Sequence, residues 1–163
     1  QKLKEGAKTL NYLAEHGIDS YEALDRRLTE LNAAVDDSLA AIKAVEGRIA
    51  ELNLIAKYAA TYRKCRPVYN RYRKSGDKEK FLRGHESEII LFEAAARELK
   101  RLGAVPMPAT ERLEAELLEL TVRKGTLYAQ YTAAKRQAKE YDTIKRNLDI
   151  LLPPEQSVTH ELE

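Results

Sequence analysis

Apolar residues recur at alternating intervals of three and four along the first part of the chain. This spacing averages 3.5 residues and is kept over more than five heptads, which is typical of a coiled-coil helix. We expect that helix over residues 19–64, with Asp19 as its N-cap and Glu22 as the capping-box partner. The positions of this first seam are Tyr21, Leu24, Leu28, Leu31, Val35, Ser38, Ile42, Val45, Ile49, Leu52, Ala56 and Ala59.

A second seam with the same alternation predicts a second long helix over residues 109–152. Gly103, Pro106 and Pro108 break the chain before it, and Pro153 follows it. Two of its positions are lysines, whose aliphatic stems can cover apolar surface while the ammonium reaches water. The positions are Leu113, Leu117, Leu120, Lys124, Leu127, Tyr131, Ala134, Ala138, Tyr141, Lys145, Leu148 and Leu152.

The two ends of the chain predict less structure than the two seams do. Residues 1–17 predict a short helix that Gly17 ends, and residues 153–163 predict a tail. The opening residues, Gln1 to Lys4, have the character of a helix interior, so we expect a piece of a longer protein. Whether Leu162 and Glu163 are native is left open.

The fold class that these patterns predict is all-α. Two helices of matched length, about 65 Å each, favour a long antiparallel coiled-coil hairpin with a small helical, basic end. In that register Leu24 lies near Leu148, and Ala59 lies near Leu113. A parallel homodimer through either seam is the alternative, because a heptad seam serves both arrangements.

Residues 65–103 predict a helical tip that is both basic and aromatic. Tyr58, Tyr62, Cys65, Tyr69 and Tyr72 fall on one helical stripe. Pro67 should kink that helix, and Asp77 should cap the next one, with an interruption near Gly84. The apolar face between Ile89 and Leu102 is wide enough to predict burial between helices.

Charge is concentrated in this middle part of the chain. Residues 57–85 hold ten basic and two acidic residues, a local charge of +8, whereas the whole chain carries +2 and the remainder therefore −6. Cations interleaved with tyrosines are typical of a nucleic-acid surface. The competing interpretation is that the tyrosines pack on a neighbouring helix and the cations are a solvated face. The candidate nucleic-acid-binding residues are Lys57, Arg63, Lys64, Arg66, Arg71, Arg73, Lys74, Lys78, Lys80 and Arg83.

The motifs of catalysis and metal binding are missing from the sequence. His16, His85 and His160 are scattered, and Cys65 is the single cysteine. No phosphate-binding glycine loop or nucleophile elbow occurs. We therefore expect no catalytic residue, no metal site and no cofactor. Without a membrane span or a signal peptide, the sequence favours the cytoplasm.

Two segments resemble the C-terminal regions of relaxases, the mobilisation proteins of conjugative transposons in Gram-positive bacteria. They run from Tyr62 to Tyr69 (YRKCRPVY) and from Gly76 to Glu93 (GDKEKFLRGHESEIILFE). The similarity extends from Tyr12 to Leu152. Relaxases nick DNA with a tyrosine and a histidine-bound metal in an N-terminal domain, and nothing here matches that cluster.

The resemblance implies a non-catalytic domain that supports conjugative DNA transfer. Its partners would be DNA at the transfer origin, or relaxosome or coupling proteins. The alternative is a coiled-coil interaction or dimerisation module without direct DNA contact.

Overall fold

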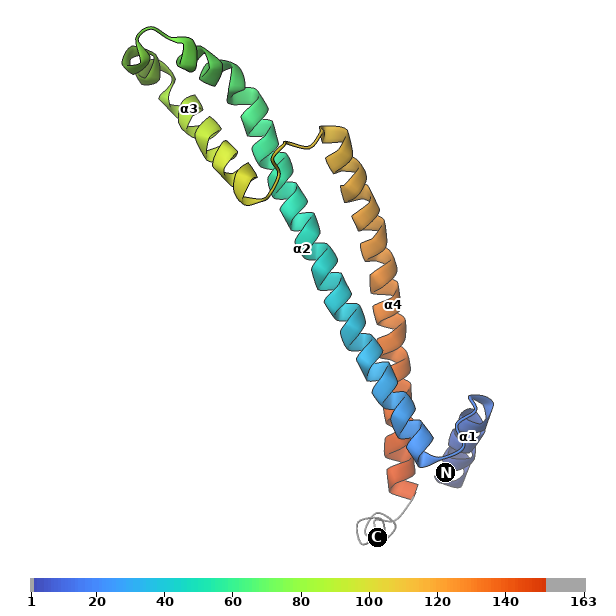
Figure 1. Cartoon of the computed structure of the whole chain (residues 1–163). Coiled ribbons are helices and arrows are strands. Elements are labelled where there is room, and N and C mark those ends of the chain that lie inside the picture. The colour runs from blue at the N-terminus through green and yellow to red at the C-terminus, as the bar shows by residue number, and fades with distance from the viewer. Residues whose placement is uncertain (1, 152–163) are drawn as a thin grey trace. The chain divides into compact units, whose positions relative to one another are not determined.

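The computed structural model describes residues 2–151, and within them the chain forms four helices and no strand. These are α1 (Lys2–Glu15), α2 (Tyr21–Lys74), α3 (Lys78–Arg101) and α4 (Thr110–Leu151) (Figure 1). The all-helical prediction is confirmed. The helices belong to two compact units. Within the described residues, unit 1 contains 2–42 and 126–151, and unit 2 is Lys43–Gly125.

Both predicted seams are the buried sides of their helices. In α2 every seam residue is buried or half-buried except Tyr21, which is 41% exposed at the first position of the helix. In α4 every seam residue from Leu113 to Leu148 is at least half-buried, Lys124 and Lys145 included. Leu152 and the predicted tail lie outside the described residues. The 3.5-residue period therefore identified the core face of both helices.

Unit 1 is built from α1, the first part of α2 and the last part of α4. Tyr21 donates a hydrogen bond from its hydroxyl to Asp149 (2.9 Å), and Asp25 pairs with Lys145. Both contacts join the beginning of α2 to the end of α4. The core cluster contains Leu13, Leu24, Leu28, Leu31, Ala138 and Tyr141, with Leu148 packed against it.

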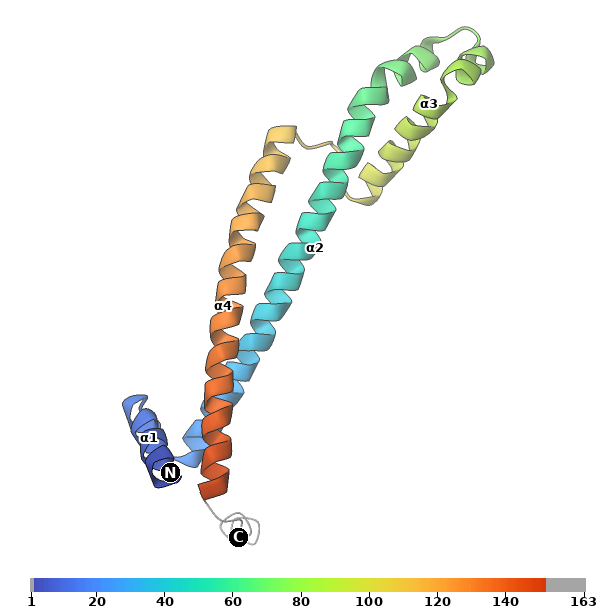
Figure 2. The same ribbon diagram turned by 180° about the vertical axis from the view of Figure 1, so that it is seen from behind.

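Unit 2 joins the later part of α2 to α3 and the start of α4. In both ribbon views α3 returns alongside the C-terminal part of α2 (Figures 1 and 2). The core cluster here contains Leu52, Ile55, Ala59, Leu99, Ala104 and Leu113. Of the apolar face predicted between Ile89 and Leu102, the side chains of Ile89, Phe92, Ala95 and Leu99 are buried. Ile90 and Leu91, which belong to the same predicted face, are 53% and 52% exposed, so only part of that face is packed.

Two glycines end helices in the same way. Gly17 and Gly103 have φ angles of 70° and 71°, the left-handed region that side chains disfavour. Behind Gly103, the Ala104 amide donates to the Leu99 carbonyl at 2.8 Å, and Ile18 does the same to Leu13. These bonds complete Schellman motifs, which satisfy carbonyls that the helix end leaves open. The predicted helix stop at Gly17 is confirmed.

The capping residues agree with the sequence at one helix and differ at another. The Asp77 carboxylate accepts from the Lys80 amide at 3.1 Å, as predicted. At the start of α2, Ser20 rather than Asp19 is the cap, because its hydroxyl accepts from the Ala23 amide at 3.1 Å. The prediction of Asp19 was wrong by one residue, since serine and aspartate serve equally well at this position.

Helix α2 continues through Pro67 to Lys74, past residue 64, where we expected the first long helix to give way to the tip. A proline inside a helix removes one backbone hydrogen bond. On either side of Pro67, the rings of Tyr62 and Tyr69 pack on Phe92 of α3. A break does occur in α3, where His85 has non-helical angles (φ −137°, ψ 24°) directly after Gly84.

Candidate nucleic-acid interface

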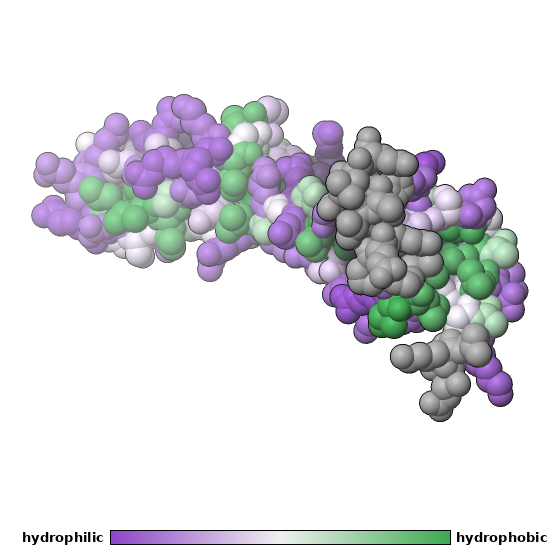
Figure 3. Space-filling model, turned by 90° about the horizontal axis from the view of Figure 1, so that it is seen from below, coloured by the Kyte–Doolittle hydropathy of each residue, from purple (hydrophilic) through white to green (hydrophobic). Residues whose placement is uncertain are grey.

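All ten predicted cations are exposed, and all lie in unit 2. Seven project from the last part of α2 and three from the start of α3, on either side of the turn at Gly76. We call this set the basic surface. On the face of the molecule visible in Figure 3, hydrophilic side chains surround smaller apolar patches. The members of the basic surface are Lys57, Arg63, Lys64, Arg66, Arg71, Arg73, Lys74, Lys78, Lys80 and Arg83.

The basic residues of α2 form rows along the helix. Lys57, Lys64 and Arg71 are spaced by seven residues, as are Arg66 and Arg73. Seven residues are nearly two full turns, so the Cα atoms in a row are about 10 Å apart and lie on almost the same side. The two rows border the side of α2 that faces away from α3, which gives a broad cationic face rather than a single charged spot.

The tyrosine stripe lies on the opposite side of α2 and packs against α3. The ring centroids of Tyr62 and Tyr69 are 4.6 Å and 4.2 Å from that of Phe92. Cys65, between them in sequence, is 4% exposed. The structure therefore supports the interpretation that these tyrosines are core residues, and their faces are already occupied by protein rings.

Three of the cations make contacts that orient them. Arg63 donates to the Thr110 hydroxyl (2.9 Å) and to the Pro108 carbonyl (3.2 Å), which links α2 to the loop before α4. The Arg71 guanidinium carbon lies 5.5 Å from the centroid of the Phe81 ring. The Lys57 ammonium lies over the Tyr58 ring. Sequence reasoning did not identify Phe81 or Thr110 as partners, because neither is related to its arginine by helical spacing.

None of the ten cations forms an ion pair with a side chain in residues 2–151. The carboxylate of Asp77 is used as the α3 cap. Elsewhere in the described chain, by contrast, Arg48, Arg101 and Lys145 each face a carboxylate. The positive charge of the basic surface is therefore not neutralised from within the chain, and phosphate groups are suitable partners for it.

The two described histidines are engaged with aromatic neighbours. The His85 ring stacks on Phe81 at a centroid distance of 4.3 Å, and His16 stacks on Tyr12 at 4.0 Å. Across residues 2–151, no three His, Cys, Asp or Glu side chains come close enough to hold a metal ion. Nor does any helix in that range have the length and apolar character needed to cross a membrane.

Comparisons with protein-family models, with curated proteins and with solved structures found no match to this chain.

Proposed function

We propose that this chain is the non-catalytic C-terminal helical domain of a relaxase, and that it supports conjugative DNA transfer by binding DNA through the basic surface. The observation that carries the proposal is the set of ten exposed cations in unit 2, none paired with a carboxylate in the described chain. A protein that neutralises phosphates releases their condensed counterions, which drives binding and makes it sensitive to salt. The resemblance in residues 62–69 and 76–93 gives the functional setting, the cytoplasmic relaxosome.

We further propose that α2 and α4 form one antiparallel coiled-coil hairpin with the basic surface near its end. Two observations support this arrangement, one from each unit. In unit 1 Tyr21 bonds to Asp149, and in unit 2 Arg48 pairs with Glu116. From the first pair to the second, the residue number rises along α2 and falls along α4, as an antiparallel hairpin requires. Cysteine pairs placed across each contact should cross-link within one chain, and cross-links only between chains would contradict the hairpin.

The test of DNA binding is a charge reversal on the basic surface. Changing Arg71, Arg73 and Lys74 to glutamate should weaken binding to single- and double-stranded origin DNA and reduce the slope of log K against log salt. Each lost phosphate contact removes about 0.7 to 0.9 from that slope. Affinity and slope are measured by fluorescence anisotropy over a salt series.

A matched control changes Lys43, Arg97 and Lys100 to glutamate. These three residues are exposed, belong to unit 2 and produce the same change in net charge, but lie outside the basic surface. If the control weakens DNA binding as much as the test variant, the effect is one of overall charge. If the test variant binds as tightly as the wild type, the basic surface is not the DNA site.

A second candidate function, a module that binds a relaxosome or coupling protein without contacting DNA, is favoured by two exposed apolar residues on α3. Ile90 and Leu91 are 53% and 52% exposed. A partner held there should remain bound to the triple charge-reversal variant and be lost when both residues become serine.

A further inference from the structure

We infer that the groove between α1 and α4 in unit 1 is a binding site for a small phosphate monoester whose body is apolar or aromatic, as in a nucleoside monophosphate. The groove has a volume of about 450 Å³, which is within the range of small-molecule sites. Every residue that lines it belongs to unit 1, whereas the whole basic surface belongs to unit 2. The inference therefore does not rest on the proposed binding of DNA.

Three cations from two helices line this groove. Lys8 comes from α1, while Arg136 and Lys139 come from α4 and are close enough in sequence to share one face of that helix. All three side chains are exposed, and none is paired with a carboxylate of a described side chain. Three such cations around one groove favour a ligand that carries more than a single negative charge.

Among the described residues that line the groove, Glu140 alone carries a carboxylate, and that carboxylate has a partner. The Tyr12 hydroxyl donates to it at 3.3 Å. Burial, and then the charge of Glu140, raises the pKa of Tyr12, so the hydroxyl keeps the proton that this bond needs. The lining therefore has three positive charges and one negative charge. The sum matches a phosphate monoester, which carries about −1.5 to −2 at neutral pH.

Apolar side chains supply another part of the contact surface. Tyr12 and Ile144 line the groove and are half-buried. The Tyr12 ring is held from two directions, because His16 stacks on it at a centroid distance of 4.0 Å and Tyr141 meets it edge-on at 6.0 Å. A side chain that is already fixed loses little conformational entropy when a ligand binds. The groove therefore suits a ligand whose body is apolar or aromatic.

The length of the groove limits the size of the ligand. From Arg136 to Ile144 it extends about 12 Å along α4, at the rise of an α-helix. Proteins that bind a single strand along a groove typically contact about four or more nucleotides. A groove of this length instead favours one phosphate with one attached ring system.

The first experiment titrates the full chain with thymidine 5′-monophosphate at about 0.15 M salt and follows the backbone amide shifts by NMR. We expect saturable shifts at the lining residues of α1 and α4, with a dissociation constant below about 1 mM. Thymidine lacks the phosphate and should bind at least about tenfold more weakly. Inorganic phosphate lacks the apolar body and should also bind more weakly than the nucleotide.

Two variants should change the affinity in opposite directions. Arg136→Gln with Lys139→Gln removes two of the three cations and should raise the dissociation constant at least about tenfold. Glu140→Gln removes the negative charge and should lower the constant about two- to fivefold, a gain that a damaged fold would not produce. The matched control is Arg26→Gln with Lys135→Gln, which should bind like the wild type. Both control residues are exposed and belong to unit 1 but lie outside the groove.

The phosphate end of a DNA strand offers the same chemistry as a free nucleotide, so the source of the monoester is tested separately. The chain with Arg71, Arg73 and Lys74 changed to glutamate is titrated with a trinucleotide that carries a 5′-phosphate, and with one that ends in a 5′-hydroxyl. If the phosphorylated trinucleotide binds in the groove more tightly than the mononucleotide, the source is a strand end. If the mononucleotide binds more tightly than both, the source is a free nucleotide.

Three results would overturn the inference. One is the absence of saturable shifts up to about 5 mM nucleotide, well above the expected constant. Another is a set of shifts confined to residues 57–83, which would make the basic surface the phosphate site. The third is unchanged affinity in the variant that lacks Arg136 and Lys139, with circular dichroism verifying its fold. The triple charge reversal on the basic surface should leave nucleotide binding in the groove unchanged, so the DNA proposal and this one can fail separately.

Discussion

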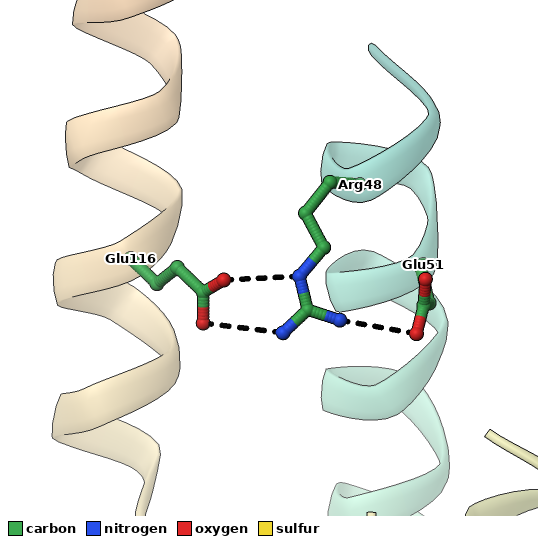
Figure 4. A network of polar contacts seen from close by, with 3 residues as sticks. All are labelled: Arg48, Glu51 and Glu116. Atoms are coloured by element: carbon green, nitrogen blue, oxygen red, sulfur yellow. Dashed lines mark hydrogen bonds and ion pairs between the residues drawn. The ribbon is translucent and has the colours of Figure 1, made fainter. Parts of the chain in front are cut away.

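The Arg48 guanidinium holds the Glu116 carboxylate across α2 and α4 with two parallel contacts, Nε to Oε1 at 3.0 Å and Nη2 to Oε2 at 3.4 Å (Figure 4). The same guanidinium donates to Glu51 on its own helix at 3.0 Å. The hydrogen bond to Glu116 is the main cause that raises the pKa of Arg48. This fork fixes the local register of the two helices in unit 2, because a bidentate pair tolerates little displacement.

Removing the charge of Glu116 should therefore destabilise unit 2 slightly. The side chains of Arg48 and Glu116 are 42% and 38% exposed, so we expect Glu116→Gln to lower the free energy of unfolding by about 0.5 to 1 kcal/mol. Urea denaturation measures the change. Glu51→Gln is the control for the contact within α2 and should cost less, and an equal cost in both variants would contradict a special role for the contact between helices.

The aromatic stack between α2 and α3 should contribute much more. Phe92 is 6% exposed and contacts the rings of both Tyr62 and Tyr69. Phe92→Ala should cost about 3 kcal/mol, since it leaves a cavity between two helices. The exposed Ile90, two residues earlier, is the control, and Ile90→Ala should change stability by less than about 0.5 kcal/mol. Hydrogen exchange should show faster opening of α3 in Phe92→Ala, and unchanged exchange would contradict the stack as the anchor of α3.

Two glycines should respond to alanine in opposite directions. At Gly103 the φ of 71° strains any side chain, so Gly103→Ala should lower stability by about 1 kcal/mol. Gly47 lies inside α2 with open space around it, and Gly47→Ala should raise stability by about 1 kcal/mol through helix propensity. Thermal unfolding of the two variants measures both effects. The same sign for both would contradict the Schellman ending at Gly103.

Unit 1 should lose stability in alkaline solution. Burial, and then the hydrogen bond to Asp149, raises the pKa of Tyr21 above its usual value near 10. The hydrogen bond to Asp25 likewise raises the pKa of Lys145. Both side chains hold their proton more tightly in the folded state than in the unfolded state. The stabilisation that they contribute is therefore complete below the pKa values of the unfolded state, and it is lost as the pH rises past the pKa values of the folded state.

The variant Tyr21→Phe isolates the tyrosine part of this dependence. Its stability should fall less steeply than that of the wild type above about pH 10, as measured by thermal unfolding at a series of pH values. Tyr58→Phe in unit 2 is the control, since the Tyr58 hydroxyl makes no hydrogen bond with a described residue. An identical alkaline slope in Tyr21→Phe and wild type would rule out the Tyr21–Asp149 bond as a source of the dependence.

Incubation with supercoiled plasmid that carries a transfer origin should yield no nicked product, with Mg²⁺ or with Mn²⁺. The described residues hold no cluster of metal ligands, and the side chains of Tyr62, Tyr69 and Tyr72 are half-buried against α3. A nicked circle with protein covalently attached would contradict the proposal of a non-catalytic domain. Agarose gels with and without protease treatment distinguish the two results.

The hydrophobic period predicted more of the fold than of the candidate site. It identified the buried faces of α2 and α4, because the 3.5-residue repeat of Leu24 to Ala59 is a property of one helix at a time. It did not separate Asp19 from Ser20 as the cap, which depends on one hydroxyl reaching one amide.

The sequence by itself determined which residues are charged, where the chain turns and which helix faces seek burial, since composition and period are local properties. Only the tertiary structure decided what those faces meet. Whether Tyr62 and Tyr69 face DNA or Phe92, and whether a cation of the basic surface has a carboxylate beside it, depends on contacts between residues far apart in the chain. Apolar helix faces can be paired in more ways than a periodic pattern can distinguish. Close packing of side chains selects among these pairings.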